Sequence, residues 1–382
     1  MTAATAAGAG CGSPDLPVTT VADSAGISIV TNLGSAPVLG WTLDTVRVFG
    51  GDESGPATFY QVRSALVDVD SRGRIHLLEP GEYRVVVFDS TGQAVSSMGR
   101  QGEGPGELEW PLSVSVGGDG FTYVHDGGGQ LVRLKPGEES GSESPLSYSV
   151  INMGLRHVEA TPEGLLIWAR ARFTETTTVA ELDARVVRLL SVRGEDTIPL
   201  IPGNPGHRTT AHYPRCNFTF SIHRPLAPRI RWSQWGDRVA VSAWGGFRID
   251  VLEGHRLVRS VRWAGVGERE LSRAEAEALL EAQGYLGPCN DDVGETIDKH
   301  GFHPRPQVVS GLAVAPDGYM WAEVGRADVG SRILVLAPEG RIEGVLPDGF
   351  PMPLTFLPDG RAVIQVVDSL DFERVGIGHV GR

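Results

Sequence analysis

The sequence predicts an all-β protein, a six-bladed β-propeller with four-stranded antiparallel blades and a small helix-containing insertion. Three observations predict this fold. A short turn followed by a strand-like run occurs six times. Several of the spacings match the roughly 40–50 residues of a propeller blade. The 50 glycines and 25 prolines among 382 residues suit short strands joined by tight turns.

The six turns mark successive blades, because Asp-Gly turns between alternating apolar runs are strong hairpin signals. Their reference residues are Gly73, Gly120, Gly164, Asp237, Gly318 and Gly360. Neighbouring turns are 47, 44 and 42 residues apart where the spacing is regular. The two longer intervals, of 73 and 81 residues, each leave room for an insertion. We expect these insertions near 194–229 and near 266–306, and the many prolines of the first argue against regular strands there.

One confident helix lies in the second insertion, in the run LSRAEAEALLEAQG. Ser272 and Glu275 have the spacing of a capping box, and Gly284 supplies a C-terminal stop. No helical pattern separates the strands elsewhere, so parallel βαβ units are excluded. The run 26–32 is expected to complete the last blade and close the ring. The chain is therefore interpreted as a tail over 1–20 and one propeller domain over 21–382.

The amino-terminal run MTAATAAGAGCGSPD resembles the cleavage end of a bacterial lipoprotein signal, in which Cys11 would be lipidated. A flexible Ala/Gly tail with an incidental cysteine is the alternative. Cys216 and Cys289 lie in different insertions and could form a disulfide in an oxidising compartment. Two unpaired buried thiols remain the alternative for this pair.

The net charge of −13 argues against a nucleic-acid partner, because such binding depends on Lys and Arg contacts to phosphates. No stretch reaches the 18 or more apolar residues of a transmembrane helix. Contact with a membrane is expected only through the lipid anchor, and the protein is expected to be a monomer.

The ten residues GRQGEGPGEL, 99–108, look at first like a phosphate-binding loop. A Walker loop needs a Lys-Ser/Thr pair that enters a helix, whereas Glu107, Leu108 and Glu109 follow here. A similar stretch begins at Gly50, offset by 49 residues. We therefore interpret the motif as a repeated connection between blades.

The motifs DSAGISIVTN (23–32), GEGPGEL (102–108) and LPDGRAVIQVVDSLDFERVGI (357–377) resemble bacterial six-bladed β-propeller proteins, with NHL-like repeats. Many proteins of this group are predicted lipoproteins. The resemblance covers nearly the whole chain after about residue 20. It implies the architecture and a place in the cell envelope, but not an activity, since one fold hosts many functions.

Two sets of side chains are candidates for a site. Histidines are common metal ligands, and they occur in the first insertion and on strands that could reach the axis. Calcium or zinc would be the cofactor, although no cofactor is certain; the candidate ligands are His207, His212, His223, His76 and His125. Trp232 and Trp244 are candidates for binding a ligand, although packing between blades is the favoured explanation for them.

The preferred interpretation is a binding or scaffold module of the cell envelope that recognises a peptide, glycan or partner protein at one mouth of the ring. It would be periplasmic or attached to the outer membrane, with secretion as the alternative. The competing interpretation is a metal-assisted hydrolase or lyase with a cation on the central axis. A purely structural envelope protein is a third possibility.

Overall fold

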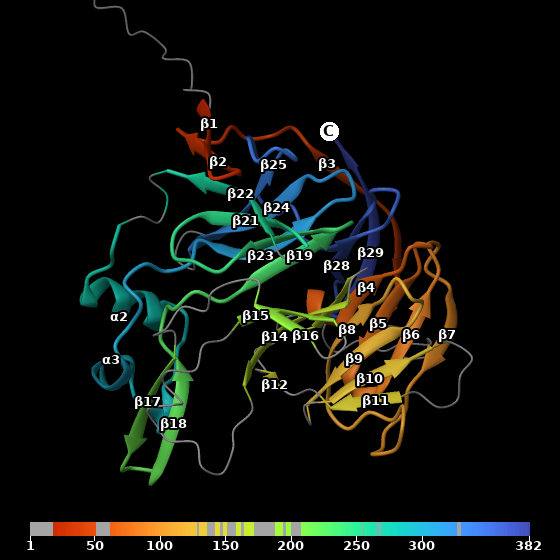
Figure 1. Ribbon diagram of the computed structural model, residues 1–382, viewed down its shortest axis with the longest axis horizontal. Helices are drawn as coiled ribbons and strands as arrows, with labels where there is room; N and C mark the ends of the chain where they lie inside the picture. The colour runs from red at the N-terminus through yellow and green to blue at the C-terminus, as the bar shows by residue number, and fades with distance from the viewer. Residues whose placement is uncertain are drawn as a thin grey trace, which may run out of the picture.

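The computed structural model describes residues 18–50, 62–127, 130–135, 142–145, 148–150, 158–161, 164–171, 188–193, 196–199, 208–254, 256–264, 266, 269–326 and 330–382. This part of the chain is mostly β-strand with two α-helices (Figure 1). No helix within it is long and apolar enough to cross a membrane.

Three antiparallel sheets come first along the chain. Sheet I contains β4 (Val67–Val69), β5 (Ile75–Glu79), β6 (Arg84–Phe88) and β7 (Ala94–Met98). Sheet II contains β8 (Pro111–Val116), β9 (Thr122–Asp126), β10 (Gln130–Leu134) and β11 (Ser142–Pro145). Sheet III contains β13 (Val158–Thr161), β14 (Gly164–Ala171), β15 (Arg188–Arg193) and β16 (Asp196–Pro199), with β12 (Tyr148–Val150) also paired to β14.

Three further sheets follow, two of which recruit amino-terminal strands. Sheet IV contains β19 (Arg231–Trp235), β20 (Arg238–Ser242), β21 (Arg248–Glu253) and β22 (Arg256–Trp263), extended by β2 (Ile27–Leu33) and β1 (Val18–Ser24). Sheet V contains β23 (Val309–Val314), β24 (Met320–Arg326), β25 (Gly330–Leu336) and β26 (Ile342–Val345). Sheet VI contains β27 (Pro353–Phe356), β28 (Ala362–Val367), β29 (Glu373–Gly381) and β3 (Thr42–Phe49).

The remaining elements are short or belong to the insertions. They are the hairpin of β17 (Arg208–Tyr213) and β18 (Phe218–His223), the helices α2 (Arg273–Ala282) and α3 (Val293–His300), and the 3-10 turns η1 (Ser64–Leu66), η2 (Pro80–Glu82) and η3 (Pro288–Asn290).

Five of the six turns read from the sequence connect the first and second strands of sheets I, II, IV, V and VI. In sheet I the turn is held by Asp70, whose Oδ1 accepts hydrogen bonds from the backbone N–H groups of Arg72 and Arg74. Gly73 in the same turn has φ +76°, a conformation that favours glycine. The turn of sheet III includes 162–163, which lie outside the described residues.

The sheets follow one another around a common axis. The first strands of neighbouring sheets contact each other: β27 with β4, β4 with β8, β8 with β13, β19 with β23, and β23 with β27. Apolar clusters fill the space between neighbouring sheets. Val67 and Ile75 of sheet I pack with Val363 of sheet VI, and Leu78 packs with Val124 of sheet II. This arrangement is that of a β-propeller, as the sequence predicts.

The closure of the ring differs from the expectation. Sheet VI is completed by β3, which pairs antiparallel with β29. The run 26–32 was expected in that place, and this prediction is wrong, because β2 pairs parallel with β22 of sheet IV. Strand β1 begins at Val18 and so overlaps the expected tail 1–20.

The first insertion also differs from the expectation. Within the range 194–229, β16 pairs with β15 and belongs to sheet III. The prolines of this range do not prevent strands either, since β17 and β18 form a regular hairpin. Pro214 stands in its turn and Pro225 after its second strand, so neither interrupts the pairing.

The second insertion contains the expected helix. The side chain of Ser272 accepts a hydrogen bond from the Glu275 backbone, and the Glu275 carboxylate accepts one from the Ser272 backbone. Gly284 follows the helix with φ +62°. Figure 1 shows α2 and α3 beside the hairpin of β17 and β18, away from sheets I and II.

The loop 99–108 is a closed connection from β7 to β8. The Leu108 backbone N–H donates to the Arg100 carbonyl at 2.8 Å, and the Leu108 side chain is fully buried. The Glu107 carboxylate accepts a hydrogen bond from the Gly104 N–H at 2.9 Å. A phosphate bound by this loop would need backbone N–H donors such as that of Gly104. This N–H group is already hydrogen-bonded to the Glu107 carboxylate.

Candidate functional site

A pocket of about 430 Å³ lies where the first strands of the sheets meet. Its lining comes from η1, β4, β19, β23 and β27, from the end of β8, and from the turns that follow these five strands. The lining residues are Ser64, Asp68, Val69, Asp70, Ser71, Val116, Gly117, Gly118, Trp232, Ser233, Gln234, Trp235, Gly236, Leu312, Val314, Pro316, Leu354, Thr355, Phe356 and Pro358. We call this space the axial pocket.

Asp68 joins two sheets at the wall of the axial pocket. Its Oδ2 accepts hydrogen bonds from the Ser115 hydroxyl at 3.0 Å and from the Val116 backbone N–H at 2.8 Å. Its Oδ1 accepts a hydrogen bond from the Val69 N–H at 2.9 Å. The carboxylate is thus held by donors of β4 and β8, and its position is set by the packing of sheets I and II.

Asp70 is the second carboxylate of the pocket wall. Arg74 Nε donates to its Oδ2 at 2.6 Å, in addition to the backbone donors of the turn. Burial alone would raise the pKa of Asp70, but His76 nearby and the hydrogen bonds from Arg74 hold this pKa well below its usual range. Asp70 is therefore a carboxylate at neutral pH, with its charge balanced by Arg74.

His76 lies next to Asp70 but is not one of the residues that line the pocket. Its Nδ1 and the Thr122 hydroxyl are hydrogen-bonded at 2.9 Å, and its Nε2 lies 3.6 Å from Asp70 Oδ2. The second distance is too long for a hydrogen bond. Because His76 and Thr122 are almost fully buried between sheets I and II, this chain of side chains orients Asp70.

Strand β19 also lines the axial pocket. Trp232 and Trp235 both line it, and Trp232 is the residue that the sequence named as a binding candidate. The Ser233 hydroxyl accepts a hydrogen bond from the Val314 N–H at 3.0 Å, which joins sheet IV to sheet V. Trp244, the other candidate, is not part of the lining, and its ring is covered by the Arg248 guanidinium at 4.1 Å.

The structure does not bring the predicted metal ligands together. His76 and His125 lie on β5 and β9, while His212 and His223 lie on the hairpin of the insertion. Burial lowers the pKa of His125 to about 4, so its imidazole is neutral at physiological pH. His207 lies outside the described residues. Among the residues described, no three His, Cys, Asp or Glu side chains are placed to hold a metal ion.

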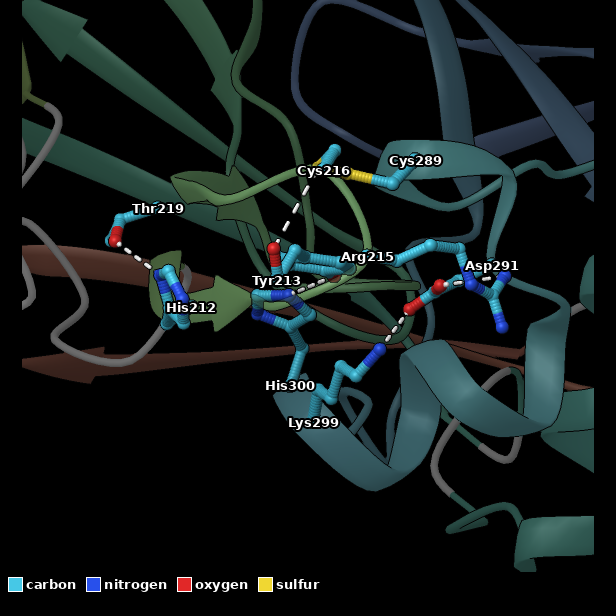
Figure 2. The surroundings of a disulfide bond; sticks show 9 residues. All are labelled: His212, Tyr213, Arg215, Cys216, Thr219, Cys289, Asp291, Lys299 and His300. Carbon is cyan, nitrogen blue, oxygen red and sulfur yellow. Dashed lines mark hydrogen bonds and ion pairs between the residues drawn. A yellow bond between two sulfur atoms is a disulfide. The ribbon is translucent and has the colours of Figure 1, made fainter.

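Cys216 and Cys289 form a disulfide, with Cα atoms 6.1 Å apart (Figure 2). This disulfide is one of the two alternatives that the sequence analysis gave for these cysteines. It connects the turn of the hairpin of β17 and β18 to η3. Further contacts surround it. Asp291, which is buried, lies 3.5 Å from Arg215 and pairs with Lys299.

A buried hydroxyl–imidazole contact completes the connection of the hairpin to α3. Tyr213 Oη and His300 Nε2 are 2.5 Å apart, and the Thr209 hydroxyl lies 3.2 Å from His300 Nδ1. Burial raises the pKa of Tyr213 to about 12, with the Asp291 charge acting in the same direction. The phenol is therefore neutral, and the cluster holds the two insertions together.

Most of the pocket residues were not named from the sequence. Thr355, Gly118 and Pro358 line the pocket because of their position. Each lies in, or next to, the turn between the first two strands of its sheet. Asp68 and Thr355, which both line the pocket, precede a marker glycine by five residues, but Ser115 at the same position does not line it. Reading that position across the repeats would therefore have indicated only part of the lining.

No protein-family model matches the chain, and no curated protein matches it. Among solved structures, it is similar to a Bacteroides fragilis protein named for its expected export, with a TM-score of 0.55 and 13% identity over 93% of this chain and 100% of the other. It is also similar to a member of the DUF4221 family from Bacteroides vulgatus, with a TM-score of 0.52 and 11% identity over 90% and 99% of the two chains. At these identities the likeness shows the fold alone.

Proposed function

We propose that the chain is a six-bladed propeller of the cell envelope that binds a peptide, a glycan or a segment of a partner protein in the axial pocket. Each of sheets I to VI is one blade in this proposal, and the hairpin with α2 and α3 is an addition to the ring. Ligand pockets of proteins are commonly a few hundred Å³ in volume with a small number of placed polar groups.

The single observation that carries the proposal is the composition of the axial pocket. Its lining residues include the tryptophans Trp232 and Trp235 and the aspartates Asp68 and Asp70. Indole rings offer flat apolar contact area at low conformational cost. Hydroxyl and amide groups of Ser233, Gln234 and Thr355 can fix the orientation of a polar ligand.

The envelope location rests on three features. A disulfide favours an oxidising compartment, and one similar solved structure is of a protein named for its expected export. Cys11 lies outside the described residues, and its lipidation remains a prediction that mass spectrometry of the membrane-expressed chain tests. An unmodified Cys11 would contradict the anchor.

The enzymatic alternative needs convergent ligands or a poised nucleophile in the pocket. Asp68 and Asp70 are its acidic side chains, and both are occupied by hydrogen bonds from neighbouring groups. Within the described lining the geometry therefore favours binding over a metal-assisted hydrolase or lyase.

The test is a fluorescence titration, because two tryptophans line the pocket. The probes are a mixed tetrapeptide library, a set of neutral oligosaccharides and soluble peptidoglycan fragments, which carry both chemistries. We expect a saturable change in tryptophan emission with at least one probe set, and its loss in Trp232→Phe/Trp235→Phe. The absence of any saturable change with all three sets would contradict a peptide- or glycan-binding pocket.

A further inference from the structure

Sheet IV ends in a strand whose outer edge is open. The strands of this sheet follow the order β1, β2, β22, β21, β20 and β19, so β1 is the outermost strand. Among the described strands, only β2 pairs with β1, and Figure 1 shows β1 at the rim of the molecule. Val18 and Val21 of this strand are 58% and 68% exposed. An open edge presents a row of backbone N–H and C=O groups that can pair with another strand.

Strand β1 lacks the features that usually protect an outer strand from such pairing, which are bulges, charged side chains and prolines. Its seven residues pair with β2 in continuous register, without a bulge. Its sequence, VTTVADS, contains four β-branched residues and a single charged residue, Asp23. A regular and weakly charged strand of this kind is a template for a further strand.

The outer strands of the other five sheets each have at least one protecting feature. Strand β3 carries Asp44 and Arg47, and β11 and β16 end in Pro145 and Pro199. Strand β7 pairs with β6 across a register shift. The outer side of β26 is already used, because its last residue accepts a hydrogen bond from the Leu39 N–H at 2.8 Å. Among the outer strands of sheets I to VI, β1 is therefore the one without protection.

The turn between β1 and β2 determines which backbone groups of β1 face outward. The two turn residues, 25–26, both have positive φ, and the pair that flanks them is Ser24 and Ile27. In a two-residue hairpin this flanking pair is hydrogen-bonded, and such pairs alternate along an antiparallel ladder. Every second residue of β1 therefore directs its N–H and C=O groups away from β2. The outward-facing residues are Thr19, Val21 and Asp23.

A second copy of β1 is complementary to this edge. When two β1 strands pair antiparallel about a two-fold axis at Val21, this valine lies opposite its own copy, and Thr19 lies opposite Asp23 of the second copy. The outward N–H and C=O groups of all three residues then meet groups of the same kind of strand. No two like charges lie opposite each other, which would be destabilising.

The side chains of the open edge support the same occupant. Val21 is paired with Val30, and Thr19 is paired with Asn32, so their side chains share one face of sheet IV. Val30 and Asn32 are 2% and 0% exposed. The buried face of the sheet therefore continues to Val21, which is exposed only because the sheet ends there. A second Val21 beside it would extend the apolar contact.

We infer that two copies of the chain pair along β1 and form a two-fold symmetric dimer with one continuous sheet. Strand β19, which lines the axial pocket, lies at the other side of sheet IV from β1. The dimer therefore leaves both axial pockets open, and its formation does not depend on the proposed ligand. The sequence led us to expect a monomer, and the experiment decides between the two.

Sedimentation velocity of the full chain between about 1 μM and about 300 μM tests the inference. A contact of one strand from each copy is small, so we expect a Kd in the micromolar range and a mass that rises with concentration. The largest species should be the dimer, because a two-fold contact is closed. The mass of one chain at every concentration would overturn the inference, and so would growth beyond two chains.

Variants assign the contact to β1. Val21→Lys places two like charges opposite each other at the two-fold axis and should raise the Kd at least about tenfold. The matched control is Val95→Lys, at a valine of β7 that is 50% exposed, which should dimerise as the wild type does. Circular dichroism and Tm check that both variants are folded. An unchanged Kd in Val21→Lys, or an equal rise in both variants, would overturn the assignment to β1.

Discussion

At the scale of single residues, aspartates that look alike in the sequence have different structural roles. Asp70, Asp89 and Asp368 each accept hydrogen bonds from backbone N–H groups two and four residues further on, so they hold turns. Aspartate side chains commonly cap turns in this way. Asp68 instead bridges two sheets through Ser115. Whether an aspartate caps its own turn or bridges two sheets depends on which strand is innermost in the sheet. A local sequence pattern does not reveal which strand that is.

Asp70 should make stability depend on pH in a defined direction. Its folded pKa is held below the unfolded value of about 3.9. The unfolded chain therefore binds the proton first on acidification, so the stabilisation is complete above about pH 5 and is lost as the pH falls further. Asp70→Asn should lower the free energy of unfolding at pH 7 by roughly 1–3 kcal/mol, since charge-assisted hydrogen bonds are lost.

The measurement is chemical unfolding of wild type and Asp70→Asn at pH 7 and at pH 3. The difference between the two proteins should shrink at the lower pH. Asp359→Asn, at an exposed turn carboxylate, is the control and should change stability less. A difference that does not depend on pH would show that the ionised form of Asp70 is not stabilised by the fold.

At the scale of elements, a buried side chain of β2, Asn32, adds hydrogen bonds to the pairing of β2 with β22. The Asn32 amide donates to the carbonyls of Arg262 and Gly340, at 3.2 and 3.0 Å. Its Oδ1 accepts hydrogen bonds from the Ile342 N–H and the Thr19 hydroxyl. These contacts connect the amino-terminal hairpin to sheets IV and V.

Asn32→Ala should therefore lower the free energy of unfolding by roughly 2–4 kcal/mol, because buried backbone groups lose their partners. Thr20→Ala on the exposed strand β1 is the control and should change it by less than about 0.5 kcal/mol. Urea unfolding followed by circular dichroism measures both. Equal effects of the two substitutions would mean that β2 is held by its strand pairing alone.

The disulfide should stabilise the insertions rather than the ring. It closes a loop with a sequence separation of 73 residues, for which chain-entropy arguments give roughly 2–5 kcal/mol. Cys216→Ser/Cys289→Ser should therefore expose the hairpin of β17 and β18 to limited proteolysis while the sheets stay intact. Cys11→Ser is the control. Proteolysis at the wild-type rate would show that the contacts around Asp291 and His300 suffice without the disulfide.

Local signals explain which elements could be predicted. The turn at Gly73 and the capping box of α2 depend on residues within a few positions of one another, and both are present as predicted. The pairing of β3 with β29 joins residues more than 300 positions apart. A pattern search cannot choose between 26–32 and 42–49 for that place, because both runs alternate and only three-dimensional packing decides.

At the scale of the whole molecule, the repeat could be read from the sequence but the site could not. Equivalent positions before each turn carry Asp68, Ser115 and Thr355, so the repeats share a backbone while their side chains differ. The axial pocket arises only when these unlike positions meet around one axis. The candidate histidines illustrate the same limit, since the sequence shows their chemistry but does not show that His76, His125 and the hairpin histidines His212 and His223 lie on different elements.

The central claim is that ligand binding takes place in the axial pocket. Gly118 lines this pocket, and a Cβ atom added there would meet no other heavy atom within 4 Å. Gly81 in η2 is equally open and lies outside the lining. Gly118→Trp should therefore fill the pocket without disturbing the fold, and Gly81→Trp is its matched control.

The decisive measurement is the shift in Tm that saturating peptidoglycan fragments, or whichever probe set is active, produce in the three proteins. We predict the same rise in Tm for wild type and Gly81→Trp, and no rise for Gly118→Trp at an unchanged Tm without the probe. A rise in Gly118→Trp equal to that of the wild type would contradict binding in the axial pocket.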